Sequence, residues 1–234
     1  MKKNIVVIGG TSGIGNELVR ILDQDHHVFV FSRTNKNLEG LQASYTVEDV
    51  QSEQDPNIAH LPEQIDGLIY CPGTINLRPV QNLKKQSLLK DLEVNFFGIH
   101  RWVQALLPRL KKSEQSSIVL FSTVAVKVGM PYHTSIAAAK GAVEAYGKSL
   151  AAELAPKVRV NIIAPSLTHT PLADKYLNNE EKLQKSAARH PLHAVGSPKE
   201  IAELAAFLAL EKSSWMSGQI IQVDGGLSTL KTDM

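Results

Sequence analysis

The residues best suited to chemistry begin with a glycine-rich turn near the N-terminus. The short apolar segment Asn4–Ile8 runs directly into this turn, and an amphipathic segment follows it. Glycines let the backbone turn sharply and approach a ligand closely, and a helix N-terminus offers free N–H groups to phosphate. An ordinary glycine turn is the alternative, but a strand before and a helix after favour a dinucleotide site. Its predicted contacts are Gly9, Thr11, Ser12, Gly13, Ile14 and Gly15.

The next segment bears on which dinucleotide is bound. A second apolar run ends at Ser32 and Arg33, about where a Rossmann-type fold selects the ribose. No acidic residue stands there to accept a hydrogen bond from a 2′-hydroxyl, whereas the fork of an arginine matches a 2′-phosphate. We therefore expect NADP(H) rather than NAD(H), with a surface arginine as the competing interpretation. Asp49 and Val50, at the end of a third run, are the predicted clasp for adenine.

Strands and helices must alternate to position these groups. The apolar runs are short, rich in Val and Ile and without strict alternation, as in strands buried on both faces of a parallel sheet. Helical patterns lie between them, and Ser197 with Pro198 and Glu200 forms a capping signature. This alternation predicts one doubly wound α/β domain over residues 1–234, with helices on both faces. The expected strands are Asn4–Ile8, His27–Ser32, Tyr45–Asp49, Gly67–Cys71, Ser117–Ser122, Arg159–Ala164 and Gln219–Val223, and the expected helices are Ile14–Asp23, Ser87–Lys111, Ser135–Ala155 and Pro198–Leu210.

Composition excludes several other classes of protein. The chain has 234 residues, 43% of them hydrophobic and 21% charged, with a net charge of +2 and no basic block, so we expect neither nucleic-acid nor membrane partners. No apolar run is long enough to span a bilayer. The single cysteine, Cys71, allows no intrachain disulfide, which fits the cytoplasm.

Taken in order, the motifs resemble those of the short-chain dehydrogenases/reductases along essentially the whole chain. Each match is weak alone, and their order and spacing are specific. The resemblance implies a Rossmann-type parallel sheet of about seven strands, NAD(P)-dependent hydride transfer at a carbonyl or alcohol carbon, and a homodimer or homotetramer. The matches are the GGTSGIG turn, Asp49, Gly73, Asn95 in VNFFG, Thr123, Lys140, Asn161, Pro165 with Thr170, and Val223-Asp224-Gly225-Gly226.

The resemblance also implies roles for individual residues. Lys140 matches the lysine that binds the nicotinamide ribose, Asn95 the asparagine of the proton relay, and Thr123, beside Ser122, the hydroxyl that holds the substrate oxygen. Pro165 opens the loop over the nicotinamide, where Thr168 and Thr170 offer further hydroxyls. The chain departs from the family where Tyr70-Cys71-Pro72-Gly73 replaces Asn-Asn-Ala-Gly, and Ser166 replaces a glycine.

The most informative departure lies four residues before Lys140, where the family carries its proton-donating tyrosine. This chain has Ile136, which holds no proton to donate. Enoyl reductases of the same family place their tyrosine seven residues before the lysine, which is His133 here, preceded by Tyr132, and either side chain is a candidate donor. Alternatively, the substrate is a conjugated C=C with water, Thr123 and Asn95 as proton sources. A third interpretation is a catalytically silent module that binds the dinucleotide as a sensor or partner subunit.

The irregular stretch Ser166–Ser197 has the length of a functional lid. Its leucines and tyrosine, from Leu172 through Tyr176 and Leu177 to Leu183, predict a partly apolar pocket for a small-molecule substrate. Its histidines, His169, His190 and His193, fit no metal-ligand spacing, so no metal site is expected.

Overall fold

A seven-stranded parallel sheet organises the chain, and the computed structural model describes residues 2–232. The strand order is β3-β2-β1-β4-β5-β6-β7, so the chain reverses its direction of progress between β1 and β4. This is the doubly wound fold that the sequence predicts. The strands are β1 Asn4–Ile8, β2 His27–Ser32, β3 Ser44–Val47, β4 Gly67–Tyr70, β5 Ser116–Phe121, β6 Val158–Pro165 and β7 Ile220–Val223.

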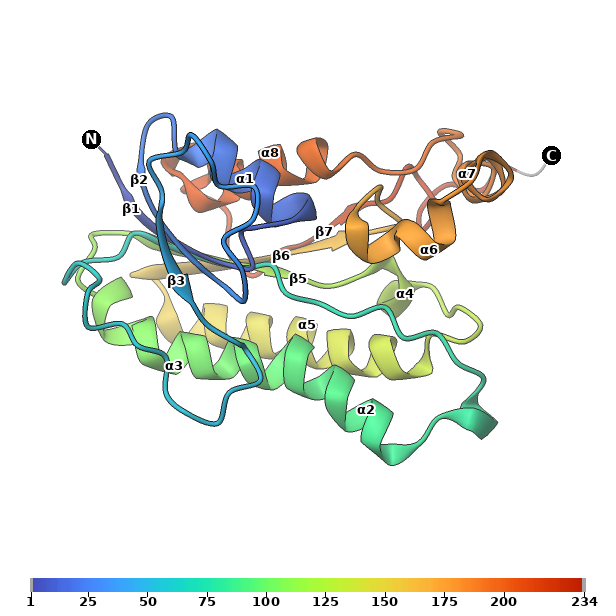
Figure 1. Ribbon diagram of the computed structural model, residues 1–234, viewed down its shortest axis with the longest axis horizontal. Helices are drawn as coiled ribbons and strands as arrows, with labels where there is room; N and C mark the ends of the chain where they lie inside the picture. The colour runs from blue at the N-terminus through green and yellow to red at the C-terminus, as the bar shows by residue number, and fades with distance from the viewer. Residues whose placement is uncertain (1, 233–234) are drawn as a thin grey trace.

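Helices cover both faces of the sheet (Figure 1). On one face lie α1, Gly13–Leu22, and α8, Pro198–Ala209, which pack on each other. On the other face lie α2, Lys85–Leu92, α3, Gly98–Leu110, and α5, Thr134–Leu154. The shorter elements are η1 Val80–Asn82, η2 Glu93–Phe97, α4 Val124–Lys127, η3 Pro171–Ala173, α6 Asp174–Leu177, α7 Glu180–Ala187 and η4 Glu211–Ser213. No helix within residues 2–232 has both the length and the apolar character needed to cross a membrane.

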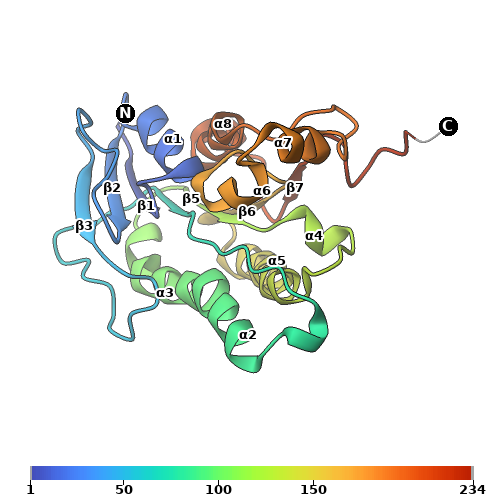
Figure 2. The same cartoon turned by 45° about the vertical axis from the view of Figure 1, so that its right-hand side comes forward.

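Two expectations for the helices need correction. The expected helix over residues 87–111 is divided, because a π-helical turn, η2, separates α2 from α3. The stretch from Ser166 to Ser197 is not irregular throughout, since it contains η3, α6 and α7. Figure 2 shows α6 and α7 on the same side of the sheet as α1 and α8. The predicted cap of α8 is present, because the Ser197 side chain and Glu200 form both halves of a capping box.

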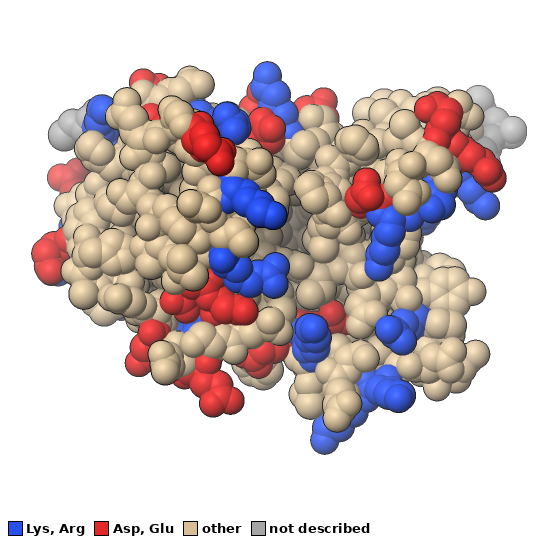
Figure 3. All heavy atoms as spheres, viewed as in Figure 1, with Lys and Arg blue, Asp and Glu red and all other residues tan. Residues whose placement is uncertain are grey.

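The carboxyl ends of the strands create the functional edge of the sheet. In a doubly wound sheet a crevice opens beyond these ends, at the point where the strand order reverses. Here that point lies between Ile8 of β1 and Tyr70 of β4, which are paired in register. The space-filling view shows that this face of the molecule is hollowed near its middle (Figure 3).

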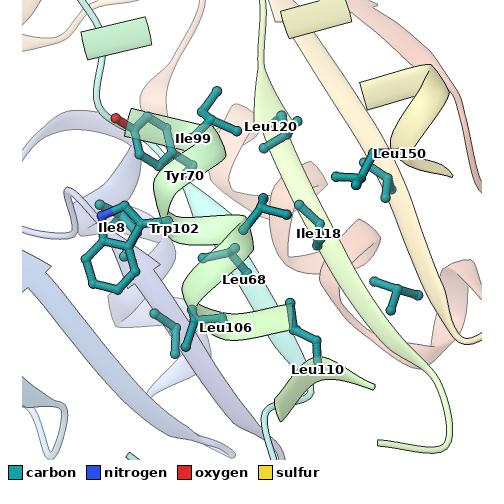
Figure 4. Close-up of a cluster of buried hydrophobic side chains, with 14 of the residues drawn as sticks. Ile8, Leu68, Tyr70, Ile99, Trp102, Leu106, Leu110, Ile118, Leu120 and Leu150 are labelled. Atoms are coloured by element: carbon teal, nitrogen blue, oxygen red, sulfur yellow. The ribbon is translucent and has the colours of Figure 1, made fainter. Parts of the chain in front are cut away.

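The main hydrophobic core fixes the sheet against α3 and α5. Ile8, Leu68 and Ile118 project from β1, β4 and β5, and they pack in one cluster with Trp102 and Leu106 of α3 (Figure 4). All five side chains are at most 1% exposed. Burial of this kind contributes about 1.5–3 kcal/mol per large apolar side chain, so the strand ends are held by a rigid base.

Candidate active site

The glycine-rich turn between β1 and α1 has a geometry that only glycine permits. Gly9 and Gly13 have φ angles of +77° and +52°, in the left-handed region. A Cβ atom on Gly15 would lie 2.3 Å from the Gly9 carbonyl oxygen, so no side chain fits there. Ser12 is the N-cap of α1, yet its side chain makes no capping hydrogen bond. The hydroxyl and the first N–H groups of α1 are thus available to an anion.

A cavity of about 910 Å³ opens directly over this turn. Arg33 stands at its rim with an exposed side chain, and Ser32 is fixed by a 2.8 Å hydrogen bond between its hydroxyl and that of Thr11. The loop after β3 supplies the opposite wall. Of the predicted nucleotide-binding residues, those that line this cavity are Gly9, Thr11, Ser12, Gly13, Ile14, Gly15, Ser32, Arg33, Asp49, Val50, Gly73 and Thr170.

A second cavity, of about 470 Å³, lies beside the first. The two share Ile14, Gly73, Thr74 and Thr170 among their lining residues, so they form one continuous cleft along the strand ends. The predicted residues that line the second cavity are Ser122, Thr123, His133, Lys140, Pro165, Thr168, Thr170, Ile14 and Gly73. The cleft therefore offers an elongated dinucleotide a phosphate cradle at one end and a group of hydroxyl and amino groups at the other.

Lys140 lines the second cavity, and its side chain is buried. Its Nζ atom donates a 2.8 Å hydrogen bond to the carbonyl oxygen of Phe121, at the end of β5. Burial disfavours the ammonium ion and lowers the pKa of Lys140 to about 8, while the neighbouring thiol of Cys71 acts in the opposite direction. Burial also raises the pKa of Cys71 to about 12, so that thiol stays neutral near pH 7. Lys140 therefore loses its proton at a lower pH than an exposed lysine does.

The two hydroxyls after β5 are not equivalent. The Ser122 hydroxyl donates a 2.6 Å hydrogen bond to Glu144 of α5, so its proton is already committed. The Thr123 oxygen accepts the backbone N–H of Ala125 at 3.4 Å, as the N-cap of α4. Its own proton has no acceptor within the described residues. Thr123 is thus the hydroxyl that remains free to donate to a substrate oxygen.

Asn95 lies behind the cavity wall rather than in it, and the π-helical turn η2 determines its position. Its amide nitrogen donates to Thr74 Oγ1 and to the Asp91 carbonyl, both at 2.8 Å. Its Oδ1 atom is buried and has no hydrogen-bond partner in residues 2–232. A Cβ on Gly73 would lie 3.3 Å from this oxygen and 3.8 Å from Lys140 Nζ, so Gly73, which lines both cavities, stands next to both groups.

Asp91 is a buried acid that the sequence reasoning missed. It is 2% exposed and accepts hydrogen bonds from the hydroxyls of Thr74 and Ser135, at 2.6 and 2.5 Å. Through Thr74 it joins α2, α5 and the loop after β4 to Asn95. Its spacing of four residues from Asn95 could have indicated a place on the same helical face. The sequence did not show which hydroxyls would donate hydrogen bonds to it.

Of the two candidate proton donors, one lines the second cavity and the other does not. His133 lines the second cavity beside Ile136, which is 5% exposed. The Nδ1 atom of His133 lies 2.7 Å from the Pro131 carbonyl oxygen, which can only accept, so Nδ1 carries hydrogen and Nε2 is left free. Tyr132 does not line the cavity, and it is 58% exposed with a φ angle of +69°.

Another pair of residues on the cavity wall joins the lid to the sheet. His190 is 4% exposed, and its Nδ1 atom donates to the Ser186 carbonyl oxygen at 2.9 Å. Its Nε2 atom consequently accepts the hydroxyl of Ser166, at 2.8 Å. The sequence reasoning singled out Ser166 as a departure and placed His190 in a polar loop, but it had no means of pairing residues so distant in the chain.

Comparisons with known proteins agree with this geometry. A family model described as enoyl-(acyl carrier protein) reductase matches residues 9–228. A tropinone reductase homolog of Arabidopsis thaliana is 32% identical over 240 residues, covering 95% of this chain and 78% of that protein. The 3-oxoacyl-[acyl-carrier-protein] reductase FabG of Thermotoga maritima is 30% identical, with 96% of this chain and 97% of that protein covered.

Solved structures give the same result. An actinorhodin polyketide ketoreductase crystallised with NADPH superimposes with a TM-score of 0.91 at 26% identity, covering 98% of both chains. A short-chain dehydrogenase family protein from Francisella tularensis has a TM-score of 0.90 at 27% identity, covering 98% of this chain and 100% of that one. The family match, the fold and the cleft agree along nearly the entire sequence. The chain belongs to the short-chain dehydrogenase/reductase family of NAD(P)-binding oxidoreductases.

Proposed function

We propose that this protein is an NADP(H)-dependent carbonyl reductase for a small, partly apolar substrate. The observation that carries the proposal is the continuous cleft, which joins the glycine-rich turn to Lys140, Thr123 and His133. Ile75, Leu77, Met130 and Leu172 give the substrate end an apolar lining. The relatives named as reductases of carbonyl compounds support the reaction class, and they favour it over a catalytically silent module.

The phosphate-selecting end of the cleft supports NADP(H). Arg33 and Lys36 both line the nucleotide cavity close to the end of β2, and neither makes an ion pair within residues 2–232. A guanidinium binds a 2′-phosphate through two parallel hydrogen bonds, which a 2′-hydroxyl cannot replace. The ketoreductase of similar structure was solved with NADPH, which agrees with this assignment.

The reacting carbonyl must receive a hydride at carbon and a proton at oxygen. The reduced nicotinamide supplies the hydride when it is bound. In this proposal Lys140 binds the ribose, Asn95 orients an ordered water from behind the cavity wall, and Thr123 donates a hydrogen bond to the carbonyl oxygen. These roles are the ones that the sequence motifs of the family imply for the three residues.

His133 supplies the proton in this proposal. Ile136 lies four residues before Lys140, the position where the family carries its tyrosine. Its side chain lines the cavity and has no titratable group. The contact with Pro131 keeps hydrogen on Nδ1, so His133 delivers a proton from Nε2 as the imidazolium and is left as the neutral imidazole. His133 lines the cavity and Tyr132 does not, which is why we choose His133.

The experiment is NADPH consumption by the purified protein with a panel of ketones, aldehydes and enones, repeated for three variants. We expect His133→Ala to lower kcat about 100-fold or more, the usual contribution of a general acid, with little change in NADPH affinity. Tyr132→Phe serves as the matched control and should retain activity. If the wild type binds NADPH without turnover and only Ile136→Tyr restores it, the chain is a silent binding module. Turnover restricted to enones would replace carbonyl reduction with reduction of a C=C bond.

A further inference from the structure

Positive side chains surround the outer part of the substrate cavity. Lys175 of α6, Lys182 and Lys185 of α7 and Arg189 just after α7 all line it, and no Asp or Glu side chain from the described residues does so. The chain as a whole is nearly balanced, with 25 basic and 23 acidic residues. Figure 3 shows lysine and arginine side chains on both sides of the central hollow. The imbalance is therefore a property of this cavity and not of the protein.

Helical spacing explains how α7 presents this charge. Lys182 and Lys185 are three residues apart, so they lie on one face of the helix, toward the cavity, and Arg189 lines the same cavity two residues after the helix ends. The acids of the same helix, Glu180 and Glu181, do not line the cavity. The hydrogen bonds of His190 to Ser166 and Ser186 tie this end of the lid to β6, which keeps the basic face over the cleft.

Two of the four cations are free to bind a ligand. Lys175 Nζ donates to the Ile75 carbonyl at 3.2 Å, and Lys182 Nζ donates to Asn178 Oδ1 at 2.8 Å. In contrast, the side chains of Lys185 and Arg189 make no hydrogen bond and no ion pair within residues 2–232, and both are exposed where they line the open cavity. Charges that converge on a cleft with low-dielectric walls attract a counter-ion strongly, and the natural counter-ion here is the substrate.

We propose that the substrate carries an anionic group, a carboxylate or a phosphate, that Lys185 and Arg189 bind while its carbonyl lies at Thr123 and His133. This inference rests on the proposed function and gives it a substrate class: a keto acid or keto phosphate with an apolar segment between its two polar ends. Ile75, Met130 and Leu172 contact that segment. The guanidinium of Arg189 provides paired donors for two anionic oxygens. The cations line the cavity itself, which favours a small anion over an acidic protein surface.

The test compares ketones of matched chain length that do or do not carry an anionic group. We would use methyl-ketone carboxylates of about five to ten carbons, their methyl esters and the corresponding alkyl phosphates, and measure kcat/KM for each. We expect the acids or phosphates to exceed the esters by about tenfold or more, since each exposed ion pair contributes up to about fivefold. The preference should fall as salt rises from about 0.05 M to about 0.5 M, because salt screens these charges. Whether the carboxylates or the phosphates are preferred distinguishes the two anions.

The variants are Lys185→Gln, Arg189→Gln and their combination, with Lys212→Gln as the charge-matched control. Lys212 is exposed in η4 and does not line the cavity. The double variant should lose the preference for the anion and keep kcat/KM for the ester, whereas Lys212→Gln should change neither. An ester reduced as well as its acid, or a preference that survives in the double variant, overturns the proposal. So does a double variant impaired only with substrates attached to an acidic carrier protein.

A binding measurement keeps this inference separate from the proposed function. If no ketone is reduced, calorimetric titration of the same acids and esters into the protein with NADP⁺ still reports on the site. Binding that is selective for the acid and is lost in the double variant supports the anion site even though reduction has failed. Equal binding of acid and ester overturns it.

Discussion

At the scale of single residues, Lys140 combines a functional position with an unfavourable environment. Its ammonium group is buried and its main protein partner is one carbonyl oxygen, on Phe121. Burial lowers its pKa from 10.5 to about 8, so the unfolded chain holds this proton more tightly than the folded one. Burial of the charged lysine therefore destabilises the folded state, with its full effect below about pH 8, and this destabilisation disappears as the pH rises to 10.5.

Because the pKa of Lys140 is lower in the folded state than in the unfolded state, the stability of the protein should depend on pH. Between about pH 8 and pH 10.5 the unfolded state binds more protons at Lys140, so its contribution to the free energy of unfolding rises with pH. The gain is up to about 3 kcal/mol, from the size of the pKa shift. We expect the stability of wild type relative to Lys140→Met to increase across this window in urea titrations. Parallel pH profiles for the two proteins would show that Lys140 is not desolvated as described.

The sequence predicted the site residues that belong to local motifs and missed those that depend on distant pairing. The glycine-rich turn, Thr123 and Lys140 could be found because their spacing along the chain is itself the signal. Asp91 and the pair formed by Ser166 and His190 could not, because their partners lie between 17 and 44 residues away. Such contacts are fixed by the packing of helices and loops, which periodicity does not specify.

At the scale of elements, the strands were predicted well because they leave a local apolar pattern, and the lid, Ser166–Ser197, was predicted poorly because it does not. Short apolar runs located all seven strands to within about two residues, most clearly for the central strands, whose burial on both faces leaves a strong pattern. Helix α7 has no buried residue, so it lacks an apolar stripe, and its sequence resembles a polar loop. The π-helical turn was missed because one extra residue in a helical turn leaves the apolar pattern on either side intact.

Helices α2 and α5 are joined by Asp91, and removing that carboxylate should destabilise the site. In Asp91→Ala the buried hydroxyl of Ser135 and the half-buried hydroxyl of Thr74 lose their acceptor, and a buried unsatisfied group costs about 1–3 kcal/mol. We expect a loss of about 2 kcal/mol or more in the free energy of unfolding, together with reduced turnover, because Thr74 also holds Asn95. Asp91→Asn retains one acceptor and should cost less, and Asp55→Ala, at an exposed loop position, should cost almost nothing. Equal stability of Asp91→Ala and Asp55→Ala would contradict this role.

At the scale of the whole molecule, the cleft connects β1, β2, β4, β5 and β6 with the lid, so a dinucleotide bound along it would stabilise the entire fold. A ligand that binds only the folded state adds about 2.7 kcal/mol to the free energy of unfolding at 100 times its Kd. For a chain of 234 residues this corresponds to a rise in Tm of about 5–11 °C.

We expect NADPH to raise the Tm by that amount and NADH to raise it less at the same concentration. In Arg33→Ala the effect of NADPH should fall to that of NADH, since only the 2′-phosphate loses its partner, while the effect of NADH should be unchanged. Differential scanning fluorimetry over a range of nucleotide concentrations measures both. Equal losses for the two nucleotides would mean that Arg33 supports the fold of the cleft and does not select the 2′-phosphate. Because the readout is binding, it holds whether or not His133 completes the chemistry, and it separates the cofactor assignment from the assignment of the proton donor.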